Sequence, residues 1–400
     1  MPRSNTRVNT KIIRSPGLVD LHFHGAFGID CLQATAAELD LLAEKLLAGG
    51  VAAFCPTTLS CEKELLREAV TRLGAWIRKR SAPSNSRRGG RPAAIPLGIH
   101  LEGPFLNPIA RGAHPESAVR PFAWSELQAL WEASQHTLKI LTLAPELLSE
   151  PELRKLARWA DDKKVLLSMG HSRANEAQAR TAVAAGFRSV THAWNAMAFH
   201  QREPGILGAT LGHPDVYLEL ILDQIHVAPS VLRWTHAVHS PAHLCGVSDC
   251  TPAAELPPEQ SASFGPLQVQ VREGASRVIP KASQPGSAPE TQAPLAGGGR
   301  LLPELFRAWL EALSNTHSNP STFPTLMSAW LPCVTTAPLN ALRLPSARKR
   351  AVLDRLTLQW HTSQPQALKR RSVKKQAQKP PKARQSPPSE NQLTLTIHFR

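Results

Sequence analysis

The chain has 400 residues, of which 42% are hydrophobic and 5% aromatic, and its formal net charge is +15. This length can bury one large core or two smaller ones. No apolar run approaches the roughly 18 residues of a membrane span, and basic residues 1–14 lack the apolar centre of a signal peptide, so we expect a cytoplasmic protein with neither feature. The six cysteines form no C-x-x-C pair, which is typical of buried thiols in a reducing compartment.

The positive charge lies at the two ends of the chain. Residues 1–14 carry +4 and residues 343–384 carry +12, whereas residues 15–342 sum to −1. A basic tail can bind nucleic acid or another polyanion through phosphate contacts. This tail lacks the interleaved aromatic residues that stack on bases. Nucleic-acid binding is therefore expected at most through the tail, and the near-neutral body must have a different function.

Eight short apolar runs alternate with helical stretches from residue 16 onward. After the first run, Thr35 and Glu38 form the capping box of a Leu-rich helix that ends at Gly49 and Gly50. Apolar strands that alternate with helices eight times predict an α/β fold, the (β/α)8 TIM-like barrel. An open doubly wound sheet is the alternative. The eight runs are Leu18–His24, Val51–Pro56, Leu97–Glu102, Lys139–Ala144, Val165–His171, Ser189–His192, Val216–Asp223 and His243–Asp249.

The segments outside this repeat have different compositions. Residues 79–92 and 280–294 are rich in Pro and polar residues, and we expect surface insertions there. Residues 369–388 form a basic, Pro-rich tract that is too polar to pack. The remaining segments predict two closing helices, Leu301–Leu313 and Thr325–Leu331, and two late strands, Leu356–Trp360 and Leu393–Phe399.

Six side chains that can bind a metal ion lie at or just after the C-terminal ends of these runs. In a (β/α)8 barrel the catalytic residues gather at that end. Each residue alone has an ordinary explanation, such as a loop carboxylate for Glu102 or a helix N-cap for Asp249. Together, imidazole and carboxylate ligands indicate a site for Zn, Fe, Mn or Co. The six residues are His22, His24, Glu102, His171, His192 and Asp249.

Two further roles follow from residue types at these strand ends. A carboxylate such as Asp249, if it is not a tight ligand, can take a proton from metal-bound water and later give it to a leaving group. Arg202 offers a planar fork for a phosphate or carboxylate, with an ion pair to Glu203 as the alternative. Asn195, His226 and His114 are polar or cationic groups that belong to the same set.

Several ordered motifs resemble those of the N-acetylglucosamine-6-phosphate deacetylases, which belong to the amidohydrolase superfamily. The resemblance covers residues 16–345. The motifs are His100-Leu101-Glu102-Gly103-Pro104-Phe105-Leu106-Asn107, Arg111-Gly112-Ala113-His114-Pro115, Leu143-Ala144-Pro145-Glu146, Gly170-His171-Ser172, Thr191-His192-Ala193-Trp194-Asn195-Ala196-Met197, Arg202-Glu203-Pro204-Gly205 and Ser248-Asp249.

The resemblance implies a role for each matching position. Glu102, His171 and His192 would hold the primary divalent ion, and Asp249 would be the catalytic acid and base. His22 and His24 match those members that have a second metal position, so one or two ions per subunit are expected. Phosphate binding in the family can involve a dimer partner, which implies a homodimer. The implied substrate-binding residues are Ala113, His114, Asn195, Ala196, Arg202, Asp223, His226, Leu295, Ala296 and Gly297.

The resemblance also implies an activity and a second, smaller domain. The activity is metal-dependent hydrolysis of N-acetylglucosamine 6-phosphate to glucosamine 6-phosphate and acetate. Alternatives are a deacetylase of another N-acyl amino sugar, or a catalytically weak barrel whose basic tail binds a polyanion. Residues 16–345 would form the barrel, whereas residues 1–15 and 346–400 would form a reduced β-sandwich with the basic tract. One departure from the family lies in Asp223-Gln224-Ile225-His226, where Gln224 replaces the usual glycine.

Overall fold

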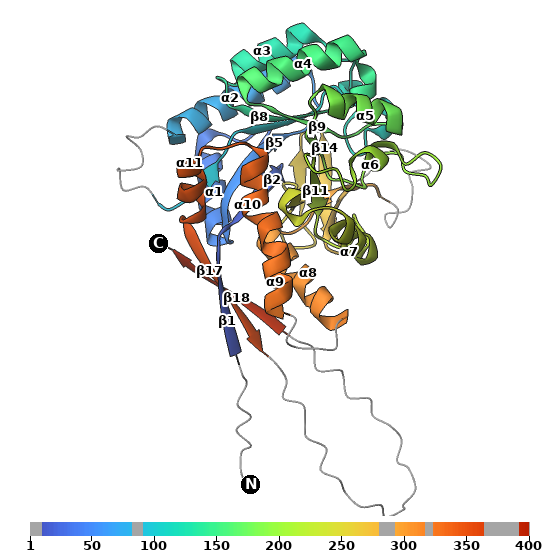
Figure 1. Cartoon of the computed structure of the whole chain (residues 1–400). Helices are drawn as coiled ribbons and strands as arrows, with labels where there is room; N and C mark the ends of the chain where they lie inside the picture. Colours follow the sequence, from blue (N-terminus) through green and yellow to red (C-terminus); the bar gives the residue numbers. More distant parts are fainter. Residues whose placement is uncertain (1–9, 82–90, 280–292, 317–322, 364–391, 400) are drawn as a thin grey trace, which may run out of the picture.

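The computed structural model describes residues 10–81, 91–279, 293–316, 323–363 and 392–399. Within them, eight parallel strands pair in the order β2, β5, β7, β8, β9, β10, β11, β12 and curve into a barrel (Figure 1). The strands are β2 (Leu18–Phe23), β5 (Val51–Thr58), β7 (Ile99–Glu102), β8 (Leu138–Leu143), β9 (Leu166–Met169), β10 (Ser189–Val190), β11 (Tyr217–Ile221) and β12 (Leu244–Val247).

The first and last strands meet, so the barrel is nearly closed. Phe23 forms a parallel bridge with Cys250, just past β12. The main-chain N–H of His24 donates to the carbonyl of Cys250 at 2.9 Å. The predicted (β/α)8 architecture is confirmed, with one strand at each of the eight predicted runs, and the open-sheet alternative is wrong.

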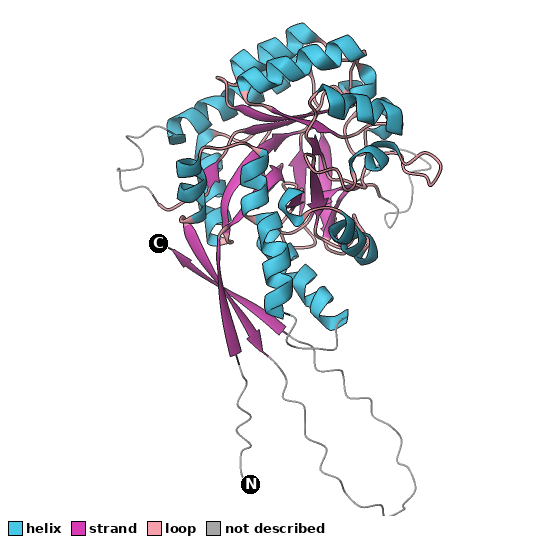
Figure 2. Cartoon of the chain, viewed as in Figure 1, coloured by secondary structure: helices cyan, strands magenta, loops and turns pink. Residues whose placement is uncertain are grey.

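Helices cover the outer side of the strands (Figure 2). Their starts follow local sequence: Thr35, Ser149 and Asn175 each form a capping box at a helix N-terminus. No helix among the described residues is long and apolar enough to span a bilayer. The helices are α1 (Ala36–Ala48), α2 (Lys63–Ser81), α3 (Trp124–Ala133), α4 (Glu150–Lys163), α5 (Glu176–Ala185), α6 (Gly205–Thr210), α7 (Pro229–Val238), α8 (Leu302–Thr316), α9 (Phe323–Trp330), α10 (Thr336–Ala341) and α11 (Ser346–Leu353).

Both ends of the chain contribute to a separate antiparallel sheet, β1–β17–β18, made of Thr10–Pro16, Leu356–Ser363 and Gln392–Phe399. Leu356, Leu358 and Trp360 alternate inward along β17 and are fully buried. The indole N–H of Trp360 donates to the Ser15 hydroxyl at 2.8 Å. The predicted small unit from the two chain ends is thus confirmed as a single three-stranded sheet. The basic tract 369–388 lies outside the described residues.

A second antiparallel sheet, absent from the sequence-based prediction, follows β12. Its strands pair in chain order: β13 (Ser261–Phe264), β14 (Leu267–Arg272), β15 (Ala275–Val278) and β16 (Leu295–Gly298). The whole predicted insertion 280–294 falls between β15 and β16. Residues 280–292 lie outside the described residues, as do residues 82–90 of the other insertion. Two short strands, β3 (Gly25–Ala26) and β4 (Ile29–Asp30), form a hairpin, and β6 (Ile95–Pro96) pairs with β5.

Candidate active site

Glu102, the last residue of β7, lies at the centre of the predicted metal site. Its Oε1 is 3.2 Å from His171 Nε2 and 3.1 Å from His192 Nε2. Its Oε2 is 3.2 Å from His24 Nε2. The strand ends that carry these residues come together because all eight strands run parallel. One buried carboxylate is therefore in contact with imidazoles on both sides.

His22, His24 and Asp249 form the other half of the cluster. His22 Nε2 is 3.1 Å from His24 Nε2 and 3.4 Å from Glu102 Oε1. Asp249 Oδ1 is 3.3 Å from His22 Nε2 and 3.4 Å from His24 Nε2. All six predicted ligand or acid–base residues are buried. The sequence-based expectation that they converge is therefore met by the geometry.

The neutral tautomer of His171 leaves a lone pair that a shared cation can bind. Its Nδ1 lies 2.9 Å from the carbonyl of Ala110, which can only accept, so Nδ1 donates and the neutral ring keeps a lone pair on Nε2. That lone pair faces His192 Nε2 at 2.9 Å and the Glu102 carboxylate. Ligands about 2.1 Å from one ion are separated by about 3.0–3.4 Å, which matches the observed spacing. The residues present therefore fit a divalent ion between them.

His114 is placed to donate a hydrogen bond. The main-chain N–H of Ser60 donates to His114 Nδ1 at 3.2 Å, so this nitrogen is unprotonated and the ring proton is on Nε2. Nε2 lies 3.3 Å from Glu102 Oε2. Burial, together with the charge of His171, lowers the pKa of His114 to about 4, so the ring is neutral at pH 7.

Charge in the cluster keeps the two acidic groups ionised. Burial opposes ionisation of Asp249, but the charge of His22 and the hydrogen bond with His24 lower its pKa to about 2. The pKa of Glu102 is likewise held well below its usual range, against the effect of burial, chiefly by the charge of His22. An ionised Asp249 at neutral pH can accept a proton.

Asp20 links the two strands that carry His22 and Asp249. Its Oδ1 accepts the main-chain N–H groups of His22 at 3.3 Å and Ser248 at 3.2 Å, and its Oδ2 accepts the Ser248 hydroxyl at 2.5 Å. Burial raises the pKa of Asp20 to about 7. This carboxyl therefore fixes the distance between β2 and the segment that follows β12.

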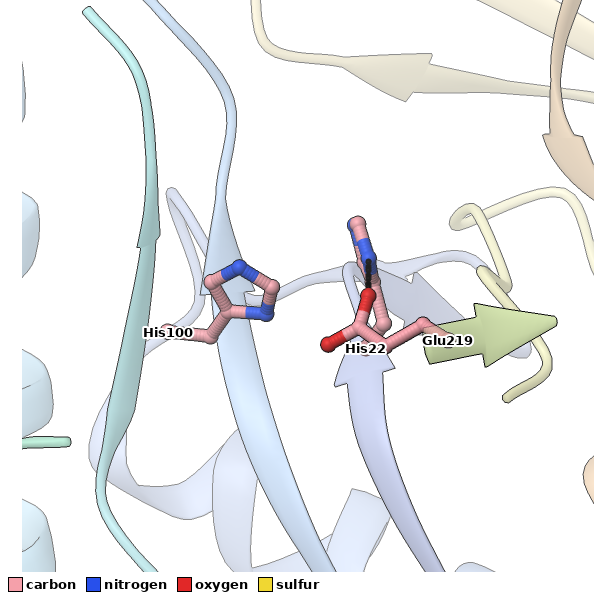
Figure 3. Close-up of side chains that lie close together, drawn as sticks. All are labelled: His22, His100 and Glu219. Carbon is pink, nitrogen blue, oxygen red and sulfur yellow. Dashed lines mark hydrogen bonds and ion pairs between the residues drawn. The ribbon is translucent and has the colours of Figure 1, made fainter. Parts of the chain in front are cut away.

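Glu219, which the sequence analysis did not identify, lies close to His22 and to His100 of the first motif (Figure 3). Glu219 Oε2 is 3.1 Å from His22 Nδ1. Glu219 lies in the middle of the apolar strand β11 and is fully buried. The available signal was that position, because a carboxylate in a buried strand needs a partner.

Several site residues have left-handed backbone conformations. The φ angles are +48° at His171, +30° at His192, +50° at Asp249, +50° at Ala196 and +64° at Gln224. Such angles cost a non-glycine residue about 1–2 kcal/mol and occur preferentially at functional sites. They direct the side chains at the strand ends into one cavity.

A pocket opens onto the Glu102 cluster, and most predicted substrate-binding residues line it. Arg202 and Asp223 do not line the pocket. No Lys or Arg is among its lining residues. Those lining residues are His24, Leu59, Glu102, Gly112, Ala113, His114, His171, His192, Asn195, Ala196, Ile221, His226, Asp249, Phe264, Leu295, Ala296 and Gly297.

His226 is a pocket residue whose protonated form is favoured by a neighbouring carboxylate. Asp223 Oδ2 lies 2.6 Å from His226 Nδ1, and Oδ1 accepts the main-chain N–H groups of Ile225 and His226, both at 2.9 Å. Burial opposes the charge of His226, but the hydrogen bond and charge of Asp223 raise its pKa above the usual value. His226 Nε2 is then the nitrogen left for a ligand.

Arg202 lies on the surface of the molecule. Its side chain is exposed. Glu203 does not pair with it but accepts the main-chain N–H groups of Glu176 at 2.7 Å and Gly205 at 3.3 Å. The ion pair that was the alternative explanation for Arg202 is thus not formed, and the guanidinium has no partner among the described residues.

Known proteins resemble the chain in sequence and fold, although no protein-family model matches it. It is 36% identical over 259 residues to the N-acetylglucosamine-6-phosphate deacetylase of Bacillus subtilis, which covers 64% of this chain and 62% of the relative. It is 35% identical over 233 residues to an N-acetylgalactosamine-6-phosphate deacetylase of Escherichia coli O157:H7, which covers 58% of each chain. The matches therefore span about 60% of the curated relatives' length.

A solved structure shares the fold more completely. It is an N-acetyl-D-glucosamine-6-phosphate deacetylase variant from Mycobacterium smegmatis in complex with N-acetyl-D-glucosamine-6-phosphate. The TM-score is 0.70 at 27% identity, and the match covers 84% of this chain and 79% of that one. The structural match thus extends beyond the part of the chain that aligns in sequence.

Proposed function

We propose that the chain, which resembles N-acetylglucosamine-6-phosphate deacetylases in sequence and fold, hydrolyses the acetamide of N-acetylglucosamine 6-phosphate. Its cofactor would be one or two divalent ions (Zn, Fe, Mn or Co). The observation that carries this proposal is the Glu102 cluster, in which imidazole nitrogens approach one carboxylate at 3.1–3.4 Å. Glu102, His171 and His192 would hold the primary ion. His22 and His24, with Glu102 as a bridge, would hold a second.

Different residues would carry out different steps of the reaction. A divalent ion at this site supplies Lewis-acid polarisation of the acetamide carbonyl and a lowered pKa of water. Asp249 accepts the proton of the attacking water and then donates it to the departing amine, which releases acetate and glucosamine 6-phosphate. His114 has its proton on Nε2, 3.3 Å from Glu102 Oε2, and would donate it to a substrate oxygen only if the substrate displaced that contact. Ala113, Asn195, Ala196, Leu295, Ala296 and Gly297 would contact the sugar from the pocket wall.

The phosphate would bind between His226 and an arginine of a second copy of the chain. The pocket wall contains no Lys or Arg, and Arg202 is exposed without a partner in the described part of its own subunit. Phe199, three positions before Arg202 in the chain, is 49% exposed and Trp234 is 45% exposed, and both rings pack on Trp194. An exposed aromatic patch is typical of an interface. We therefore propose a homodimer in which Arg202 completes the partner's site.

A second candidate substrate is N-acetylgalactosamine 6-phosphate, on which the Escherichia coli relative acts by its name. The two sugars differ in the configuration of one hydroxyl, so the same metal cluster and phosphate site would serve both.

We also propose residues 16–345 as the barrel domain and 1–15 with 346–400 as the second domain. The cytoplasmic location is a proposal supported by the cysteines, because all six are buried and unpaired.

The test is acetate release from N-acetylglucosamine 6-phosphate by wild-type protein and Asp249→Asn, with the metal content of both determined. Loss of about 10²–10⁴-fold in kcat in the variant at unchanged metal content supports the proposal, because an amide cannot exchange a proton as a general base does. No acetate from metal-loaded wild-type protein contradicts it. N-acetylgalactosamine 6-phosphate in parallel decides between the two sugars.

A further inference from the structure

Glu219 contacts two elements of the metal site at once. Figure 3 shows its carboxylate between His22 and His100, with one oxygen hydrogen-bonded to His22. That oxygen, Oε2, also accepts the main-chain N–H of His192 at 3.3 Å. The other oxygen, Oε1, is buried without a hydrogen-bond partner among the described residues. Burying an ionised carboxylate costs free energy unless it is paired, so the contacts of Glu219 with the neighbouring histidines must offset this cost.

His100 does not act as a metal ligand with Glu219, although its nitrogens lie close enough to be considered. Its Nδ1 is 3.0 Å from the carbonyl of Leu21, which can only accept, so Nδ1 donates. Its Nε2 is 2.7 Å from the Thr142 hydroxyl, which continues through Thr191 to Ser168, each step at 2.6 Å. Both ring nitrogens are therefore already used, and binding an ion would break this chain of hydrogen bonds.

His22 has the opposite arrangement. Its Nδ1 faces only the Glu219 carboxylate, which accepts and never donates when ionised. The proton of a neutral His22 ring is therefore on Nδ1, and the lone pair is on Nε2. Nε2 lies 3.4 Å from Glu102 Oε1, 3.1 Å from His24 Nε2 and 3.3 Å from Asp249 Oδ1. The lone pair thus points to the place where an ion between His22 and His24 would be bound.

We propose that Glu219 is a positioning residue that fixes the ring orientation and tautomer of His22 and thereby sets the affinity of the second metal position. This inference rests on the proposed metal-dependent function. Carboxylates that accept from the far nitrogen of a metal-binding histidine typically change metal affinity by about 10–100-fold when they are replaced. The primary position has no such carboxylate in the described part of the chain, because His171 Nδ1 donates to a main-chain carbonyl and His192 Nδ1 has no partner. The effect of Glu219 should therefore be confined to the second ion.

Glu219→Gln is the sharpest test because it keeps the size of the side chain. The glutamine amide can donate as well as accept, so it also stabilises the other tautomer of His22. In that tautomer the proton is on Nε2, which then has no lone pair to bind an ion. We expect Glu219→Gln to bind one ion as wild type does and the second about 10–100-fold more weakly. The measurements are metal content after dialysis and competition with a chromophoric chelator. Glu255→Gln is the matched control, since Glu255 accepts the main-chain N–H of Leu301 and does not line the pocket.

A double-mutant cycle separates positioning from a general structural role. In a His22→Gln background, Glu219→Gln should change the affinity of the remaining ion by less than about twofold, because the group through which it acts is gone. Equal weakening of both ions in Glu219→Gln, unchanged affinity, or a single ion in wild-type protein would each overturn the proposal. Unfolding of both Glu219→Gln and Glu219→Asp would also overturn it, since the carboxylate would then be needed by the barrel itself. Acetate release is recorded separately, so a wild type with two ions but no activity refutes only the proposed function.

Discussion

Replacing Asp223 by asparagine tests how the pocket binds an anion. The substitution keeps Oδ1, which accepts the two main-chain N–H groups at 2.9 Å and so holds the loop. It removes the charge from Oδ2, which lies 2.6 Å from His226 Nδ1. The pKa of His226, raised by Asp223, therefore falls. The variant should have an intact loop and a His226 that is protonated less readily than in wild-type protein.

The size of the effect follows from the lost charge. A hydrogen bond to a charged group contributes about 1.5–3 kcal/mol, and each 1.4 kcal/mol is about a factor of ten in affinity. The KM for the phosphorylated sugar should therefore rise about 10–100-fold while kcat changes little. In wild-type protein KM rises as the pH passes above the pKa of His226. In Asp223→Asn this rise begins at a lower pH.

The assay is steady-state acetate release with N-acetylglucosamine 6-phosphate and with unphosphorylated N-acetylglucosamine. Only the phosphorylated substrate should lose affinity, because only it carries the anion. Asp215→Asn is the matched control, as Asp215 is exposed on the surface. An equal increase in KM for both substrates, or an unchanged KM for the phosphorylated one, would refute the assignment of His226 to the phosphate.

Three further substitutions test other parts of the fold. Burial raises the pKa of Asp30 to about 6. The protonated carboxyl therefore stabilises the fold fully below pH about 4, and this stabilisation is lost as the pH rises through 6. In Asp30→Asn the free energy of unfolding in urea should lose this pH dependence between pH 4.5 and 6.5, a change of at most about 3 kcal/mol. Trp360→Ala should lower the free energy of unfolding, measured in urea, by about 3–5 kcal/mol. The reason is that the buried ring packs on Phe306 and its N–H donates a hydrogen bond to the Ser15 hydroxyl. Gln224→Gly should raise the free energy of unfolding by between zero and about 1 kcal/mol, because glycine adopts the φ angle of +64° at this position without strain.

Each of these has a control in the same chain. The pH dependence of Asp30→Asn is compared with that of wild type, and parallel curves would contradict the assigned pKa. Ile12 is 54% exposed on β1, so Ile12→Ala should stay within about 0.5 kcal/mol, and an equal loss there would mean that the end sheet does not pack through Trp360. Gln128→Gly in the exposed face of α3 should lose about 1 kcal/mol, and the same loss at Gln224 would contradict the strain argument.

The sequence predicted the barrel because each of its strands is an apolar run. Parallel strands buried on both faces need apolar residues throughout, and every residue of β2 and β5 is buried. The convergence of Glu102, His171 and Asp249 followed from the same pattern, since parallel strands end at one face of the barrel. Helix starts such as Thr35 were visible because capping is local.

The rest depended on contacts between distant segments. The strands β13 to β16 were missed because they are short and partly exposed; Ser261–Phe264, for example, alternates exposed and buried residues over only four positions. The tautomers of His114 and His171 depend on the main chain at Ser60 and Ala110, far away in sequence. The role of Glu219 depends on its contact with His22, almost 200 positions earlier in the chain. A local sequence pattern cannot reveal a contact between residues so far apart.

The sheet formed by the two chain ends also constrains when the protein can finish folding during synthesis. Pro16 pairs with Thr357, 341 positions later. At about 5–20 residues per second, the ribosome needs about 17–70 s to make the partner of β1 after β1 itself has emerged. Until then β1 has an unpaired edge, which is a template for pairing with another chain. This sheet can therefore form only after almost all of the barrel has been made.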